Sequence, residues 1–260
     1  MHVIQALWTR EWWLLATVSI AGLIEIIGWS ARIASSQTPD SVDDYIMQLS
    51  TLIIAPCFFT AMTYCLLGFI IKEQGPKYSV MPPKAFGITF IINDIISIVI
   101  QAIGGAMASL ALKSDDPNAD PDKGAHVMLG GIIYQLLCLV VYTCFFLEFV
   151  IRHWLDKPIR RGCPSGTAVD KDHDRERTKR RLSLFMIGAT TLLLLYRSGY
   201  RVAELSDGWT GRIIRTELYF DVMDGFPVVT CMALSNIFHP GFLKARTTPI
   251  RTSQYMRQYY

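Results

Sequence analysis

Six long apolar runs separated by polar segments make up most of this 260-residue chain. Within each run the apolar residues form blocks, without the 3.6-residue period of a surface helix or the alternation of a strand. A helix needs roughly 20 residues to cross about 30 Å of hydrocarbon. The pattern therefore predicts an all-α membrane protein, a polytopic helical bundle with six transmembrane helices at about residues 12–33, 45–71, 85–112, 125–151, 182–203 and 218–239.

Lys and Arg residues are divided unevenly between the two ends of these helices. If the amino terminus is cytosolic, most of them fall in cytosolic segments, as is typical of membrane proteins. The loops on the other side are acidic instead and include Asp43, Asp44, Asp115 and Asp116. We expect residues 1–243 to form one transmembrane domain and residues 244–260 a basic cytosolic tail.

The longest connection, residues 152–181, is rich in basic residues. The simpler interpretation is an orientation signal on a solvated linker. The second is contact with anionic lipids of the inner leaflet. Topology accounts for the net charge of +3, so no nucleic-acid partner is expected.

Ionisable side chains inside the apolar runs are the candidate functional residues, because lipid tolerates them only when they face protein or water. Two helical turns separate Glu25 from Arg32, and the same spacing separates Asp94 from Gln101. Each pair therefore shares one helix face. The predicted polar network, a candidate substrate pathway, consists of Glu25, Arg32, Asp94, Gln101, Gln135, Arg197, Arg201, Glu204, Glu217, Asp221 and Asp224.

Within this network we expect Arg197 and Arg201 to pair with Asp221 and Asp224, since a guanidinium group binds a carboxylate with two hydrogen bonds in a desolvated site. Such pairs can contact a substrate or only lock helices together. Arg32 and Arg201 lie near predicted helix ends and could instead extend toward the lipid headgroups.

Small residues and prolines predict how the helices pack. Gly104 and Ala108 are four residues apart and favour close approach of a neighbouring helix. Pro56 and Pro227 lie inside predicted spans, where each removes a backbone hydrogen bond and frees a carbonyl group.

Several chemical motifs are absent from the sequence. There is no phosphate-binding loop for a nucleotide-driven motor, no HExxH pair for zinc and no GxSxG nucleophile turn. We therefore expect no enzyme activity, no metal and no cofactor.

Seven segments occur in order along the chain and together carry a family resemblance. They are EIIGWSAR at 25–32, APCFFTAMTY at 55–64, NDIISIVIQAIGG at 93–105, GGIIYQ at 130–135, RSGYRVAEL at 197–205, ELYFDVMDGFP at 217–227 and HPG at 239–241. In these segments the chain resembles the RTA1-like family, the fungal lipid-translocating exporters. The resemblance implies seven helices in a fungal plasma or internal membrane, so this chain is expected to lack the family's first helix.

The resemblance also implies a role. Family members are associated with resistance to toxic amphiphiles, release of sphingoid long-chain bases and, in one branch, porphyrin movement. We therefore expect a translocator of membrane lipids or amphiphilic small molecules without an ATPase of its own. The alternative is a receptor-like stress sensor that acts indirectly on lipid composition, because buried polar networks also serve as switches.

Overall fold

In a computed structural model of the protein, the described residues are 2–38, 42–74, 78–114, 120–155, 157, 173–207, 217–239 and 241. They form helices and contain no strand. Six helical segments are long and apolar enough to cross a membrane: Trp12–Gln37, Ile46–Lys72, Pro83–Lys113, Pro121–Trp154, Arg177–Ser206 and Leu218–Ile237. The predicted all-α fold is confirmed, and the protein is a multi-pass membrane protein.

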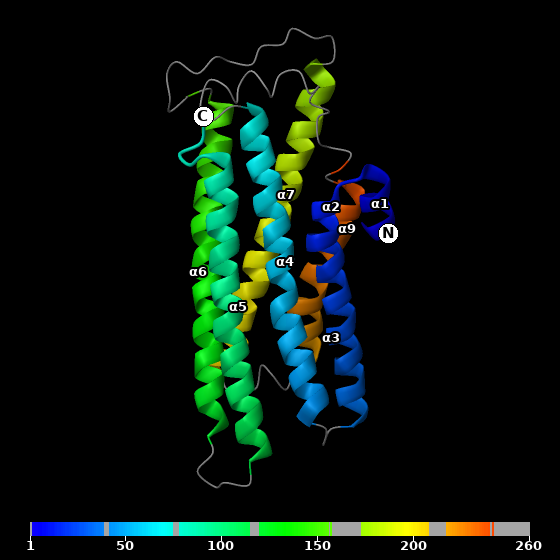
Figure 1. Ribbon diagram of the computed structural model, residues 1–260, viewed down its shortest axis with the longest axis vertical. Helices are drawn as coiled ribbons and strands as arrows, with labels where there is room; N and C mark the ends of the chain where they lie inside the picture. Colours follow the sequence, from blue (N-terminus) through cyan, green and yellow to red (C-terminus); the bar gives the residue numbers. More distant parts are fainter. Residues whose placement is uncertain are drawn as a thin grey trace.

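The helices run roughly side by side along the long axis of the molecule (Figure 1). The first span joins α2 (Trp12–Leu14), the π-helical turn η1 (Leu15–Ser19) and α3 (Ile20–Gln37). The next four spans are α4 (Val42–Gln74), α5 (Pro83–Lys113), α6 (Pro121–Trp154) and α7 (His173–Ser206). The last span joins α8 (Glu217–Phe220), the π-helical turn η3 (Asp221–Gly225) and α9 (Phe226–Ile237).

The two ends of the bundle are named here by their predicted charge. At the basic end α4 and α6 finish and α5 and α7 begin; the acidic end is the opposite one. The short helix α1 (His2–Thr9) lies beside α9 in Figure 1, and Gln5 Nε2 donates a hydrogen bond of 3.4 Å to the carbonyl of Asn236.

Most helices extend beyond the apolar runs that predicted them. The helix α7 continues to Ser206, three residues beyond the predicted bound, so Glu204 lies on it with Arg197 and Arg201, as their spacing predicted. The predicted last span is too long instead, because α9 ends at Ile237. The predicted tail at 244–260 and most of the connection at 152–181 lie outside the described residues.

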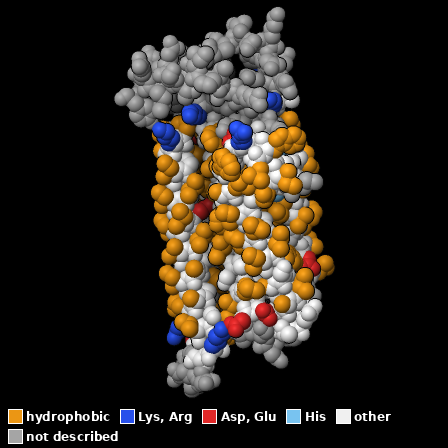
Figure 2. Space-filling model, turned by 45° about the vertical axis from the view of Figure 1, so that its right-hand side comes forward, with side chains coloured by type: hydrophobic (Ala, Val, Ile, Leu, Met, Phe, Trp, Pro, Cys, Tyr) orange, Lys and Arg blue, Asp and Glu red, His pale blue; other side chains and the backbone are white. Residues whose placement is uncertain are grey.

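The helix α4 is the central element of the bundle, since it packs against α3, α5 and α7. Its most apolar window is 67% buried inside the protein, compared with 22% for α5. The face in Figure 2 is largely apolar: it shows a broad band of hydrophobic side chains, with basic side chains at the two ends and acidic ones both at one end and within the band.

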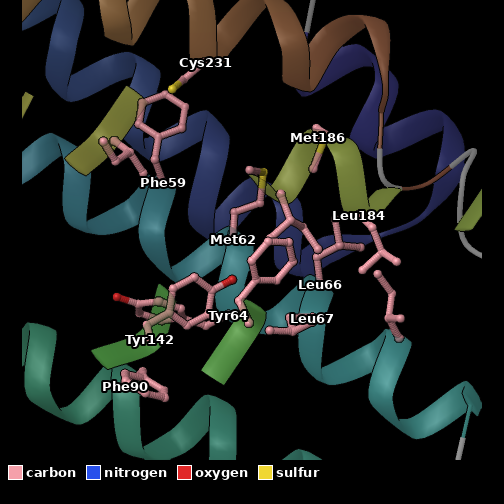
Figure 3. Packing of buried hydrophobic residues seen from close by; sticks show 14 of the residues in the cluster. Phe59, Met62, Tyr64, Leu66, Leu67, Phe90, Tyr142, Leu184, Met186 and Cys231 are labelled. Carbon is pink, nitrogen blue, oxygen red and sulfur yellow. The ribbon is translucent and has the colours of Figure 1, made fainter. Parts of the chain in front are cut away.

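Aromatic packing fills the interior toward the basic end (Figure 3). The ring centroids of Tyr64 and Tyr142 lie 4.6 Å apart, and those of Tyr64 and Phe90 lie 5.3 Å apart. Phe86, near the start of α5, packs 4.9 Å from Phe90. These four rings join α4, α5 and α6, and they are called the aromatic seal below.

The predicted close approach of a helix to Gly104 is confirmed. A Cβ atom at Gly104 would lie only 2.4 Å from the backbone nitrogen of Met128, and one at Gly124 would lie 2.3 Å from the backbone nitrogen of Ala108. The backbones of α5 and α6 therefore touch, which fixes where both helices present their polar side chains.

We expect Gly104→Ala to lower the free energy of unfolding by about 1–3 kcal/mol, because two backbones must separate to admit one methyl group. Gly130→Ala is the matched control, since a Cβ atom there meets nothing within 4 Å. Thermal unfolding in detergent measures both. Equal effects of the two substitutions would contradict the close contact.

Candidate functional site

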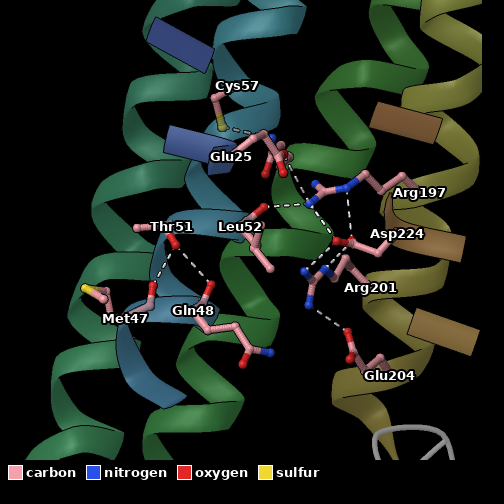
Figure 4. Close-up of polar contacts among 11 residues, drawn as sticks. Glu25, Met47, Gln48, Thr51, Leu52, Cys57, Arg197, Arg201, Glu204 and Asp224 are labelled. Carbon is pink, nitrogen blue, oxygen red and sulfur yellow. Dashed lines mark hydrogen bonds and ion pairs between the residues drawn. The ribbon is translucent and has the colours of Figure 1, made fainter. Parts of the chain in front are cut away.

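Asp224 is held between two arginines inside the bundle (Figure 4). Arg201 binds it with two hydrogen bonds, from Nε to Oδ1 at 2.7 Å and from Nη2 to Oδ2 at 3.0 Å. Arg197, one turn away on α7, donates from Nη2 to Oδ2 at 3.1 Å. One carboxylate thus ties α7 to the last span.

A π-helical turn positions Asp224. In η3 the N–H of Phe226 binds the carbonyl of Asp221, five residues back, so the helix is locally widened. Such turns are frequent at functional sites. Gly225 in this turn lets the ring of Trp29 approach, because a Cβ atom at Gly225 would lie 2.7 Å from that ring.

The proline in α4 supplies a third partner for the arginines. Pro56 has no N–H, so the carbonyl of Leu52, four residues earlier, loses its helical donor. Arg197 Nη2 donates to this carbonyl at 2.6 Å. The predicted free carbonyl therefore exists, and its partner Arg197 lines a small pocket whose walls also include Pro56 and Gln135.

Two further carboxylates, those of Glu204 and Glu25, lie next to the same two arginines. Glu204 accepts a hydrogen bond of 2.9 Å from Arg201 Nη1. Glu25 reaches Arg197 Nη2 only at 3.8 Å. The residues Glu25, Arg197, Arg201, Glu204 and Asp224, each no more than 4% exposed, are called the ionic cluster.

A second polar group joins α4, α5 and α6. Gln101 Nε2 donates to Gln135 Oε1 at 2.9 Å and to Ser97 Oγ at 2.7 Å. Gln135 Nε2 in turn donates to Cys57 Sγ at 3.0 Å. These four residues are called the amide network, and they adjoin the ionic cluster because Gln135 and Arg197 line the same pocket.

Asp94 lies near the middle of α5. The hydroxyl of Thr60 on α4 donates a hydrogen bond to Asp94 Oδ2. No described residue forms an ion pair with Asp94. The sequence indicated the same lack of a nearby cation.

The predicted pairing of the arginines is confirmed for Asp224 and is wrong for Asp221. The Asp221 side chain is 57% exposed and lies 4.0 Å from Arg32 instead. The physical reason is the π turn: residues three apart share a face in an α-helix, but the wider turn rotates them apart. Glu217 lies in α8, but its side chain is outside the described set.

Phe220 separates Arg32 from the ionic cluster. The guanidinium of Arg32 lies 3.9 Å from its ring centroid, and that of Arg201 lies 4.8 Å from the same ring. Both contacts are cation–π interactions. Arg201 is 3% exposed, so the idea that it extends toward headgroups is wrong, whereas Arg32 stays partly exposed.

Sequence reasoning missed Thr60, Ser97 and Phe220 as parts of the site. A hydroxyl group within a helix usually binds its own backbone, so its sequence position gives little signal. Among the described residues, no group of three or more His, Cys, Asp or Glu residues could hold a metal ion.

We expect Asp224→Asn to lower the free energy of unfolding by about 3–5 kcal/mol, because it leaves two buried guanidinium groups without their shared carboxylate. Asp221→Asn is the matched control, and its effect should stay within about 0.5 kcal/mol at an exposed position. Denaturant unfolding in detergent micelles measures both. A small effect at Asp224 would contradict the shared ion pair.

Comparison with known proteins agrees with this architecture. A sequence model of the family described as "RTA1 like protein" matches residues 18–247. The sphingoid long-chain base transporter RSB1 of Saccharomyces cerevisiae (strain ATCC 204508 / S288c) is 30% identical, over 96% of this chain and 70% of the relative.

Two further relatives from the same yeast strain are more distant. Protein RTA1 is 26% identical, over 85% of this chain and 69% of the relative. Protoporphyrin uptake protein 1 is 26% identical, over 80% of this chain and 62% of the relative. No solved structure matches the chain. The family match spans nearly all of the described helices, and the chain belongs to the RTA1-like family.

Proposed function

We propose that this protein moves amphiphilic molecules with polar headgroups, similar to sphingoid long-chain bases, across a membrane without an ATPase of its own. The observation that carries the proposal is a polar interior inside an apolar bundle: the ionic cluster and the amide network share a pocket at hydrocarbon depth. The names of the relatives, a long-chain base transporter and a protoporphyrin uptake protein, support the same class of cargo.

A polar interior addresses the main energetic obstacle to moving such a molecule. A headgroup that enters hydrocarbon loses its hydrogen bonds to water at a cost of several kcal/mol. Carboxylates, guanidinium groups and amides along the inside of the bundle can replace those bonds. The alkyl chain can remain in lipid, because the outer faces of the helices are apolar.

The conformation described here is closed. The pocket beside Arg197 encloses about 20 Å³, which is room for about one water molecule and not for a headgroup. The aromatic seal blocks the interior toward the basic end. Transport therefore requires the helices around the seal to separate.

Hydroxyl groups continue the polar interior into the seal. Those of Tyr64, Tyr142, Thr190 and Thr191 are buried, and neighbouring hydroxyls such as Thr60 at Tyr64 and Thr191 at Tyr142 lie outside ordinary hydrogen-bond geometry. They can bind a headgroup that passes when the seal opens.

The closed pocket also favours one alternative, a receptor-like sensor that changes lipid composition through partner proteins. A buried ion-pair network is a suitable two-state element for such a switch. A sensor would move no lipid when it is purified.

Transport by the full-length protein in liposomes distinguishes these functions. The measurement is the initial rate of transfer of radiolabelled sphinganine across the bilayer, compared with protein-free liposomes. We expect a protein-dependent rate, and we expect Asp94→Asn to lower it roughly tenfold because a headgroup contact to a charge is lost.

Glu148→Gln is the control, because Glu148 pairs with Arg152 four residues away on α6, outside both polar groups. Its rate should stay within about twofold of the unmodified protein. A rate equal to that of empty liposomes would contradict transport and favour the sensor. An unchanged rate for Asp94→Asn would remove Asp94 from the pathway.

A further inference from the structure

Glu25 differs from the other carboxylates of the ionic cluster. Its side chain is buried, and neither of its oxygens makes a hydrogen bond of ordinary geometry to a described residue, although the Trp29 indole, a possible donor, lies close to it. The nearest cationic nitrogen, Arg197 Nη2, lies 3.8 Å from Oε1. A buried polar group without hydrogen bonds is costly and needs an explanation.

The two arginines do not depend on Glu25. Arg197 already binds Asp224 and the carbonyl of Leu52. Arg201 binds Asp224 and Glu204. Glu25 is therefore the carboxylate that remains after both guanidinium groups have found closer partners.

The charges of the ionic cluster do not balance. It holds three carboxylates and two guanidinium groups, and Arg32 is occupied beyond Phe220 by its contact with Asp221. The groups around Glu25 are Arg197 and Arg201 on α7, Asp224 in η3, Cys231 on α9 and the Trp29 indole on α3. An excess negative charge at this depth is strongly unfavourable unless a cation accompanies it.

We propose that Glu25 is a binding site for one monovalent cation: the ammonium headgroup of a long-chain primary amine when this ligand is present, and a proton when it is absent. The inference rests on the proposed function for its choice of ligand. On binding, the ammonium N–H groups donate hydrogen bonds to the Glu25 carboxylate, and the proton leaves the Glu25 carboxyl oxygen for water. The net charge of the cluster is the same before and after.

The pocket gives the ligand its approach. Arg197 lines the pocket and its Nη2 lies 3.8 Å from Glu25 Oε1, so an ammonium group that enters the pocket when the helices separate reaches Glu25 once this side chain moves aside. Gln135 of the amide network lines the same pocket and can bind hydroxyl groups next to the ammonium.

The test compares two probes with the same alkyl chain in the full-length protein, reconstituted in nanodiscs of neutral lipid. Radiolabelled sphinganine carries an ammonium group, and N-acetylsphinganine is neutral. We expect tighter binding of sphinganine, and a loss of its affinity by roughly tenfold or more in Glu25→Gln. Binding of N-acetylsphinganine should not change, and Glu148→Gln should retain the preference for the amine.

Two further readouts separate a cation site from a structural role. Glu25→Gln should not lower the melting temperature, because glutamine is neutral, as the protonated Glu25 of the ligand-free protein is. Sphinganine binding should also weaken between pH 7.5 and pH 5.5 as protons compete for Glu25, and Glu25→Gln should abolish this dependence. A lower melting temperature with equal loss of both probes would overturn the inference in favour of a structural role.

If Glu25→Gln does not fold, the unmodified protein still decides the question. A hydrophobic carbodiimide should label Glu25, as read by peptide mass spectrometry, and sphinganine should protect it more than N-acetylsphinganine does. Equal labelling with both probes would overturn the site. If sphinganine binding depends on Glu25 but the protein moves no sphinganine in liposomes, only the proposed function is contradicted. If the protein moves sphinganine but Glu25→Gln keeps the preference for the amine, only this inference is contradicted.

Discussion

The structure depends on one constraint: a charge at hydrocarbon depth must find its partner inside the bundle. Asp224 meets this constraint for two arginines at once and so ties α7 to the last span. The bond from Arg197 to the Leu52 carbonyl extends the same tie to α4, across 145 residues of sequence. A proline and a π-helical turn, each unfavourable in an isolated helix, provide the acceptor and the carboxylate for these bonds.

The constraint also divides the interior into two halves. Toward the acidic end it is polar and holds the ionic cluster and the amide network; toward the basic end aromatic rings close it. The close contact of α5 with α6 aligns the two halves, because it fixes the level of Gln101 and Asp94 relative to Gln135. A bundle built in this way can present polar groups to a headgroup on one side while it prevents leakage on the other.

The positions of the spans and of the buried charges could be predicted from the sequence, each for a physical reason. Span positions follow from length and apolarity, which the bilayer imposes directly. The inward position of Arg197 and Asp224 follows from the cost of exposing charge to lipid. The exposed position of Asp221 could not be predicted, since a π turn leaves no mark on residue spacing. The contact of Arg197 with Leu52 was predictable only in part, because Pro56 indicates a free carbonyl but not its distant donor.

A double-mutant cycle between Arg201 and Asp224 tests the central claim most directly. The unfolding free energies of the unmodified protein, Arg201→Gln, Asp224→Asn and the double variant give the coupling energy of this one pair. The shared, desolvated carboxylate predicts a coupling of at least about 1 kcal/mol. Additive effects, with a coupling near zero, would contradict the account, since the two side chains would then not depend on each other inside the bundle.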